Sequence, residues 1–125
     1  MPVAFDTILI CDDSNMARKQ VKRAIPDHWD ADITFAKNGL EGLEAIRQGK
    51  GSLVFLDLTM PELDGYGVLE KVREEDLNCM VIVISADIQP DAKKRVCELG
   101  ALDFIKKPVD ADKMRDVLTQ FGLFE

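Results

Sequence analysis

The sequence predicts an α/β protein built on one five-stranded parallel sheet with helices on both faces. Short apolar runs rich in β-branched residues alternate along the chain with segments of helical period, five of each. Strands and helices that alternate in this way form doubly wound parallel sheets. With 125 residues, of which 46% are hydrophobic, the chain suits a single domain over residues 1–125, with its core at about 7–121.

Five apolar runs are the expected strands, and their composition indicates their order. The first, third and fourth are uninterrupted, as burial on both faces requires, whereas the second and fifth carry Thr34 and Asp103. The two mixed runs belong at the edges, which favours the order 2-1-3-4-5, a common doubly wound arrangement. The expected strands are Thr7–Cys11, Ile33–Ala36, Leu53–Leu56, Met80–Ile84 and Ala101–Ile105.

Apolar residues spaced three and four apart predict the helices between these strands. Asn38 followed by Glu41 is similar to a capping box, Asp110 is placed to cap the last helix, and Gly122 is placed to end it. Pro26 closes the first helix region. The apolar positions are Ala17, Val21 and Ala24; Leu40, Leu43 and Ile46; Val68, Leu69 and Val72 in a helix at about Gly65–Arg73; Ala92, Val96 and Leu99; and Met114, Val117, Leu118 and Phe121.

Composition argues against several classes of function. The chain has 16 Lys and Arg against 23 Asp and Glu, a net charge of -7, so we expect no direct binding to nucleic acid or to a membrane. Cys11, Cys79 and Cys97 form neither a metal-binding nor a disulfide pattern and suit a reducing compartment. There is no basic leader and no apolar run long enough to span a bilayer, so we expect a cytoplasmic protein.

Polar side chains follow the carboxyl ends of four strands, the edge where sheets of this order bind ligands. Asp12 and Asp13 follow the first strand, Asp57 the third, Ser85 the fourth and Lys107 the fifth. Two carboxylates about 4 Å apart repel by about 4 kcal/mol, so three together need a cation or must take up protons. Oxygen ligands without His or Cys favour Mg²⁺, for which Mn²⁺ can substitute.

These groups suit phosphoryl transfer to a carboxylate. An aspartate can become an aspartyl phosphate while a metal ion, an ammonium and a hydroxyl hold the phosphoryl oxygens. Asp57 is the best nucleophile candidate because it stands alone on its strand, whereas Asp12 and Asp13 form a pair suited to metal binding. Ser85 and Lys107 are then the predicted phosphoryl contacts.

In their order along the chain these motifs resemble the receiver domain of bacterial two-component response regulators, and single-domain chemotaxis-type members in particular. The resemblance implies a flavodoxin-like fold and phosphoryl transfer to Asp57 from a phosphohistidine of a sensor histidine kinase or phosphotransfer protein. It also implies Mg²⁺ binding by Asp13, Asp57 and the Thr59 backbone carbonyl, with Asp12 acting largely through bound water. The matching segments, within about Thr7 to Phe121, are Asp12-Asp13, Asp57-Leu-Thr-Met-Pro61 with Asp64-Gly65, Ser85-Ala86, Gly100-Ala101 and Lys107-Pro108.

The same resemblance implies a phosphorylation switch. Once Ser85 is drawn toward the phosphate, Phe104 turns inward and reshapes the face of the fourth helix, fifth strand and fifth helix for an output protein, whose identity stays open. Phe104 lacks the hydroxyl of the Tyr that is frequent there. Thr59 and Asp87 stand where family members differ and where side chains control the attacking water. We expect a monomer, and leave open a dimer that forms on phosphorylation.

Two alternative functions stay open. A Mg²⁺-dependent aspartyl-phosphate phosphatase, similar to the haloacid dehalogenase group, needs a second acid two places after the nucleophile, where Thr59 stands. A receiver-like adaptor that is not phosphorylated normally lacks one of the acids or the lysine, and this chain has them all. We therefore expect a switch and not a turnover enzyme, with chemistry confined to the phosphorylation and dephosphorylation of Asp57.

Overall fold

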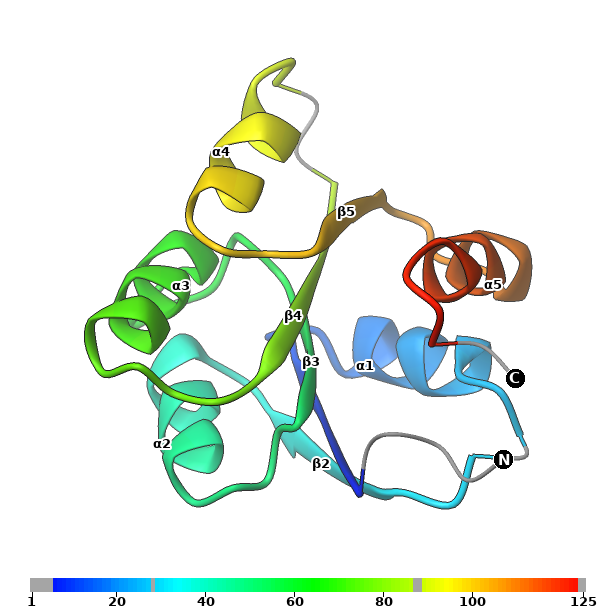
Figure 1. The fold of residues 1–125 in the computed structure, drawn as a ribbon, viewed down its shortest axis with the longest axis horizontal. Helices are drawn as coiled ribbons and strands as arrows, with labels where there is room; N and C mark the ends of the chain where they lie inside the picture. The colour runs from blue at the N-terminus through cyan, green and yellow to red at the C-terminus, as the bar shows by residue number, and fades with distance from the viewer. Residues whose placement is uncertain (1–5, 28, 87–88, 124–125) are drawn as a thin grey trace.

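Five parallel strands form one sheet in the order β2-β1-β3-β4-β5 in the computed structural model, which describes residues 6–27, 29–86 and 89–123 (Figure 1). This is the predicted order, with the two mixed strands at the edges. The strands are β1 (Thr7–Cys11), β2 (Asp32–Ala36), β3 (Leu53–Leu56), β4 (Met80–Ser85) and β5 (Asp103–Lys106). The helices are α1 (Asn15–Ala24), α2 (Gly39–Arg47), α3 (Gly65–Glu74), α4 (Ala92–Glu98) and α5 (Ala111–Gln120).

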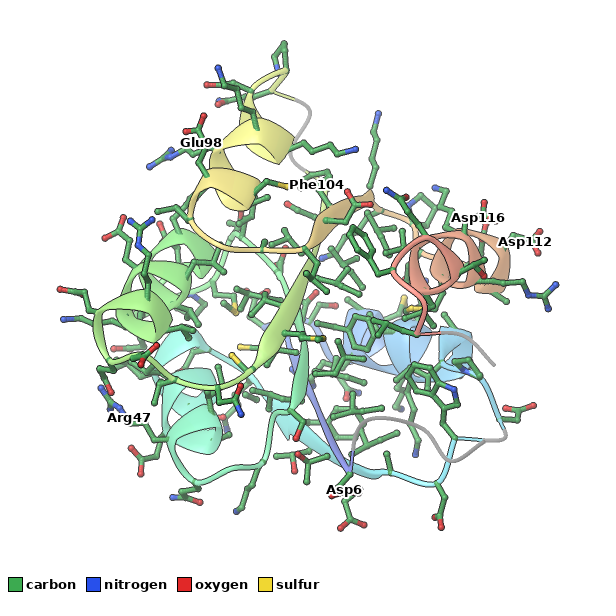
Figure 2. The ribbon with its side chains drawn as sticks, in the orientation of Figure 1. Asp6, Arg47, Glu98, Phe104, Asp112 and Asp116 are labelled. Atoms are coloured by element: carbon green, nitrogen blue, oxygen red, sulfur yellow. The ribbon has the colours of Figure 1, made fainter. Side chains whose placement is uncertain are left out.

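The helices cover both faces of the sheet, with α1 and α5 on one face and α2, α3 and α4 on the other (Figure 1). Alternate strand residues enter the two layers: Ile8 and Ile10 pack with α1 and α5, whereas Leu9 and Cys11 pack with the other three helices. Charged side chains such as Asp6 and Arg47 point outward (Figure 2). No helix within the described residues is long and apolar enough to cross a membrane.

The fifth strand begins two residues later than its apolar run predicts. The Ala101 N–H donates to the Val96 carbonyl at 3.0 Å, which closes the carboxyl end of α4. Regular pairing with β4 therefore starts only at Asp103, which lies opposite Ile82. An apolar residue can close a helix or start a strand, and hydrophobicity alone does not distinguish the two. The predicted start of the strand at Ala101 was therefore wrong.

The predicted helix ends are confirmed in their main features. Asn38 Oδ1 accepts the Glu41 N–H at 2.8 Å, but Glu41 reaches back to the Lys37 N–H, one residue earlier than in a strict capping box. Asp110 Oδ1 accepts the Lys113 N–H at 2.8 Å. Gly122 has φ of 72°, a left-handed conformation that favours glycine, directly after Phe121, the C-cap of α5.

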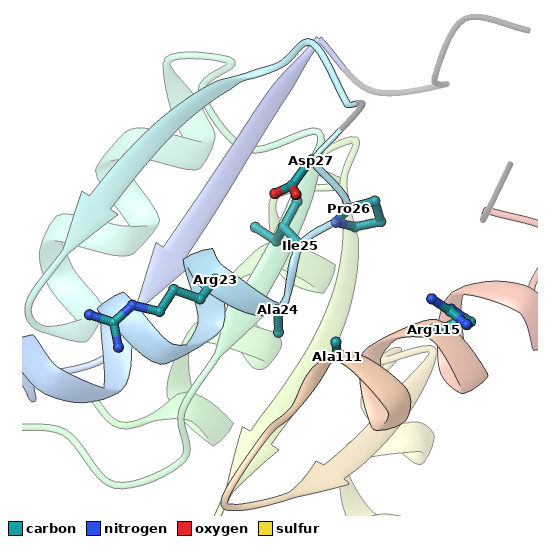
Figure 3. A pocket seen from close by; sticks show the side chains of 7 residues that line it. All are labelled: Arg23, Ala24, Ile25, Pro26, Asp27, Ala111 and Arg115. Carbon is teal, nitrogen blue, oxygen red and sulfur yellow. The ribbon is translucent and has the colours of Figure 1, made fainter.

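A pocket lies between the carboxyl end of α1 and the first turns of α5 (Figure 3). Its side chains come from these two helices and from the segment that follows α1. No predicted site residue lines it. The lining residues are Arg23, Ala24, Ile25, Pro26, Asp27, Ala111 and Arg115.

Candidate functional site

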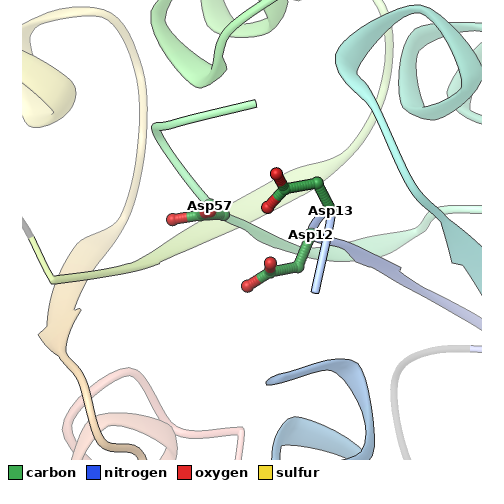
Figure 4. Close-up of side chains that lie close together, drawn as sticks. All are labelled: Asp12, Asp13 and Asp57. Atoms are coloured by element: carbon green, nitrogen blue, oxygen red, sulfur yellow. The ribbon is translucent and has the colours of Figure 1, made fainter. Parts of the chain in front are cut away.

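Three carboxylates meet where β1 and β3 end. These strands are hydrogen-bonded neighbours, and the Asp57 N–H continues their ladder by donating to the Cys11 carbonyl at 2.9 Å. One oxygen each from Asp12, Asp13 and Asp57 lies within 4.8 Å of the others (Figure 4). Asp12 and Asp57 are only 3% and 5% exposed, whereas Asp13 is open to solvent. The predicted convergence of these acids is therefore present.

The Lys107 ammonium reaches the same place from the end of β5. Its Nζ lies 2.8 Å from Asp12 Oδ2 and 3.5 Å from Asp57 Oδ1. The Lys107 N–H donates to the Ser85 carbonyl at 2.9 Å, so the loop after β5 is fastened to the end of β4. This arrangement places one cation against the two buried carboxylates.

Burial and charge shift the pKa values of these groups. The pKa of Asp57 is raised from an ordinary value of 3.8 to about 6. Burial is the main cause and the Asp12 charge acts in the same direction, whereas Lys107 and the Leu58 N–H act against both. Burial lowers the pKa of Lys107, but its hydrogen bond to Asp12 and the negative charges of Asp57 and Asp12 outweigh this, and the net shift is upward. The acid cluster is thus short of positive charge even with Lys107 in place.

Hydrogen bonds fix the orientation of the two buried acids. Asp12 Oδ1 accepts the Ser14 N–H at 2.9 Å, and Asp57 Oδ1 accepts the Leu58 N–H at 2.9 Å. Arg18, one turn into α1, donates from Nη1 to the Asp12 carbonyl at 2.6 Å. We did not predict a role for Arg18. The available signal was a cation one helical turn beyond the acid pair.

Gly65 allows α3 to begin against the backbone that carries Asp57. A Cβ at this position would lie 2.4 Å from the Asp57 carbonyl oxygen, too close for any side chain. The Gly65 N–H donates to the Leu58 carbonyl at 3.0 Å. Asp64 caps the helix through the Gly67 N–H at 2.8 Å. The Asp64-Gly65 pair therefore brings the start of α3 next to the site.

A pocket opens beside Asp57 at this edge of the sheet. Ser85 is 2% exposed at the end of β4, and Thr59 is exposed at the rim. Gln89 also lines the pocket, and no sequence pattern pointed to it, because an amide in a loop carries no periodic signal. The lining residues are Asp13, Asp57, Thr59, Ser85, Ala86, Gln89 and Lys107.

Two predicted residues lie outside this lining, and one lies outside the described residues. Asp12 does not line the pocket and is paired with Lys107. Phe104 is half-buried on β5 beside α4 and packs with the layer that includes Tyr66 and Leu99 (Figure 2). Asp87 is not among the described residues.

The donor set fits a hard divalent cation. The three acids offer only oxygen, and Mg²⁺ typically uses a few carboxylates while keeping places for water and phosphate oxygens. Cys11, beside the cluster, is an unsuitable ligand because burial raises its pKa to about 12, with the neighbouring acids adding to the effect. The residues present therefore fit Mg²⁺.

The fold and this edge together define a class: flavodoxin-like α/β domains with an acidic, cation-binding pocket at the carboxyl ends of β1 and β3. Residues 8–119 match the family described as the response regulator receiver domain. The chain belongs to this family of two-component signalling proteins, whose CheY-like members are signalling switches.

Relatives in sequence include single receivers and longer proteins. The chain is 35% identical over 111 residues to the chemotaxis protein CheY of Listeria monocytogenes, covering 89% of this chain and 93% of that protein. It is 32% identical over 113 residues to an uncharacterized response regulatory protein of Staphylococcus epidermidis, covering 89% of this chain and 44% of the relative. The chain thus spans less than half the length of that relative.

A solved structure of similar fold is the CheX–CheY–BeF3–Mg²⁺ complex from Borrelia burgdorferi. It has a TM-score of 0.83 and 31% sequence identity, and the match covers 95% of this chain and 90% of that chain. That complex contains Mg²⁺, which is consistent with the cation that the acid cluster of this chain fits.

Proposed function

We propose that this chain is a phosphoacceptor switch in which Asp57 takes a phosphoryl group from a phosphohistidine of a sensor kinase or phosphotransfer protein. One observation carries the proposal: the Asp57 carboxylate lines an open pocket, with two further acids and the Lys107 ammonium gathered around it. We take residues 1–125 as one receiver domain with its core at about 7–121.

The transfer itself needs one nucleophilic oxygen. An Asp57 carboxylate oxygen attacks phosphorus, an O–P bond forms, and the P–N bond to the donor imidazole breaks with its electron pair left on nitrogen. A pKa of about 6 leaves Asp57 roughly 90% ionised at pH 7, so the nucleophile is available. In this proposal the Ser85 hydroxyl and the Lys107 ammonium hold phosphoryl oxygens as charge moves onto them.

Asp12, Asp13, Asp57 and the Thr59 carbonyl are the proposed holders of Mg²⁺. When bound, Mg²⁺ supplies positive charge that offsets both the clustered acids and the phosphoryl oxygens. Asp12 acts through bound water in this proposal, because Lys107 already occupies its Oδ2 at 2.8 Å. Asp13 is the exposed acid and the one most accessible to an arriving ion.

Phosphorylation adds about 1.5 to 2 negative charges beside Lys107 and Ser85. Both residues join the pocket to β5, because the Lys107 N–H is bonded to the Ser85 carbonyl. Phe104 lies three residues before Lys107 and is only half-buried, so its ring still has surface that a turn inward would bury. We infer that this route changes the α4–β5–α5 face that an output protein reads.

Helix α1 offers a surface for the phosphodonor protein. It carries Arg18, Lys19, Lys22 and Arg23 and no acid, although the whole chain has a net charge of -7. Within the described residues, no ion pair joins Lys19, Lys22 or Arg23 to an acid. In α4, by contrast, Lys93 pairs with Asp103 and Lys94 with Glu98. The free cations of α1, which begins two residues after Asp13, favour a donor with an acidic surface.

Incubation with acetyl phosphate and Mg²⁺, followed by intact mass measurement, tests the function. We expect one phosphate adduct per chain that requires Mg²⁺ and is absent from Asp57→Ala, whereas Asp112→Ala, an exposed control on α5, keeps it. Sustained phosphate release from diverse phosphomonoesters would support the phosphatase instead. Complete inertness with acetyl phosphate and with phosphorylated donors would support the adaptor.

Lys107→Ala tests the switch separately from the chemistry of the metal site. The variant retains every proposed Mg²⁺ ligand, so we expect it to bind Mg²⁺. It lacks the ammonium that links the phosphate to β5, so phosphate-dependent changes in the amide spectra of α4, β5 and α5 should disappear. Unchanged shifts on that face would contradict the proposed role of Lys107.

A further inference from the structure

The Lys113 ammonium is hydrogen-bonded to the two backbone carbonyls that flank Lys107. Its Nζ donates to the Pro108 carbonyl at 2.9 Å and to the Lys106 carbonyl at 3.3 Å. Lys113 lies on α5, six residues after Lys107, and its side chain is exposed. An exposed lysine usually extends into solvent, so this two-point contact with the loop needs an explanation.

The two carbonyls lie where regular backbone pairing stops. Lys106 is the last residue of β5, an edge strand paired with β4 on one side. Pro108 has no N–H, so the segment between β5 and α5 offers fewer backbone donors than a typical loop. Backbone carbonyls in such a segment are satisfied by side chains or by water. Lys113 supplies one donor group for both.

The first turn of α5 directs the Lys113 side chain toward this loop. Asp110 caps α5 by accepting the Lys113 N–H at 2.8 Å, which fixes the backbone from which the side chain extends. Side chains on an α-helix tilt toward its N-terminus, so Lys113 extends back over the first turn. The capping aspartate and the lysine therefore form one local unit over the Lys106–Pro108 segment.

This unit affects the pocket because Lys107 belongs to the same segment. The Lys107 Nζ lies between Asp12 and Asp57, at the end of a flexible four-carbon chain. The position of Nζ depends on the Lys107 backbone. The Lys107 N–H donates to the Ser85 carbonyl at the end of β4, which ties this backbone to the sheet. From α5, Lys113 holds the carbonyls of Lys106 and Pro108, the residues on either side of Lys107. The loop is thus fastened on both sides.

We propose that Lys113 is a positioning residue: it fixes the Lys106–Pro108 backbone so that the Lys107 ammonium meets the phosphoryl group on Asp57. This role rests on the proposed function of Asp57 and Lys107. Lys113 touches neither the phosphoryl group nor the metal ligands. Reacting groups displaced by about 1 Å can lose about 100-fold in rate, so a looser loop should give a smaller but measurable loss.

Three variants test the role through the rate of Mg²⁺-dependent Asp57 phosphorylation by acetyl phosphate. Lys113→Met keeps an unbranched side chain one atom shorter than that of lysine and removes the donor, and we expect a rate about five-fold lower with the Mg²⁺ Kd within two-fold of wild type. Lys113→Arg restores a donor and should recover the rate to within two-fold. Lys50→Met removes the same charge from an exposed lysine before β3, at the opposite edge of the sheet, and should leave the rate unchanged.

Hydrogen exchange at the Lys107 amide gives a second readout. We expect it to be faster in Lys113→Met than in wild type and unchanged in Lys50→Met. If Lys113→Met does not fold, Lys113→Gln, whose amide is uncharged and ends one atom short of the lysine nitrogen, takes its place in both measurements. A wild-type rate in the donor-less variant, or an equal loss in Lys50→Met, would overturn the role of Lys113 alone. Absence of any adduct on wild-type protein would instead overturn the function of Asp57.

Discussion

At the scale of the single residue, Asp57 combines a raised pKa with near-complete burial. Its pKa lies at about 6 in the folded chain against 3.8 ordinarily, so the folded state holds the proton more tightly than the unfolded state. Ionisation of Asp57 therefore costs the folded state free energy. The contribution of Asp57 to the free energy of unfolding falls as pH rises from about 4 to 6. The charge that the proposed nucleophile Asp57 needs thus destabilises the metal-free protein.

Asp57→Asn should relieve this cost. We expect the variant, without Mg²⁺, to be more stable than wild type by about 2 kcal/mol at pH 7.5, with the difference shrinking toward zero near pH 4. Urea unfolding in the presence of a chelator, at several pH values, measures it. Asp112→Asn removes a charge from an exposed site on α5 and serves as the control. A variant less stable than wild type at pH 7.5 would refute this account.

The exposed position of Asp13 leads to a different prediction. Asp13→Ala removes one of the three clustered carboxylates without opening a cavity, so we expect the fold to persist and Mg²⁺ affinity to fall by at least ten-fold. Titration of the metal by calorimetry gives the Kd. Affinity equal to wild type would show that the metal lies elsewhere.

At the scale of the element, α3 and α4 begin with the same residue type in different geometries. Asp64 has an extended backbone and its side chain accepts the Gly67 N–H, whereas Asp91 has a helical backbone and makes no side-chain cap. The two aspartates therefore form a matched pair for measuring the value of a cap.

Asp64→Ala should lower the free energy of unfolding by about 1 kcal/mol, while Asp91→Ala should change it by less than half as much. Chemical unfolding of both variants at neutral pH gives the comparison. Equal losses would mean that the loss of charge, and not the hydrogen bond, controls the stability at these positions. The Asp64 change should also disturb Asp57, because α3 starts against its backbone.

At the scale of the whole molecule, charge is distributed unevenly. A net charge of -7 coexists with a helix, α1, that carries four cations and no acid. Opposite charges at an interface mainly raise the association rate and are screened by salt. We therefore expect phosphotransfer from the cognate kinase to slow with ionic strength.

Charge reversal on α1 tests this arrangement. The double variant Lys19→Glu with Lys22→Glu should slow phosphotransfer from the cognate kinase by at least ten-fold, while the rate with acetyl phosphate stays within two-fold of wild type. The control reverses two exposed lysines elsewhere, Lys37→Glu with Lys50→Glu. If both double variants slow protein-mediated transfer equally, net charge and not the α1 surface is responsible.

The sequence by itself determined the class of fold and the set of predicted site residues. Two-sided burial demands unbroken apolar strands, and this rule placed β1, β3 and β4 inside the sheet and the strands with Thr34 and Asp103 at its edges. Parallel strands end at one edge, so the sequence alone places Asp12, Asp13, Asp57, Ser85 and Lys107 at a common rim.

Only the tertiary structure decided which of these side chains touch and how far their pKa values shift. Lys107 and Asp12 are 95 residues apart, and no local pattern shows that their side chains meet at 2.8 Å or that Asp57 is buried enough for its pKa to rise. The contacts of Arg18 and Lys113 with backbone carbonyls likewise could not be predicted from the sequence. Periodicity reports which face of an element is apolar, whereas hydrogen bonds and desolvation depend on distances that exist only after the elements have packed.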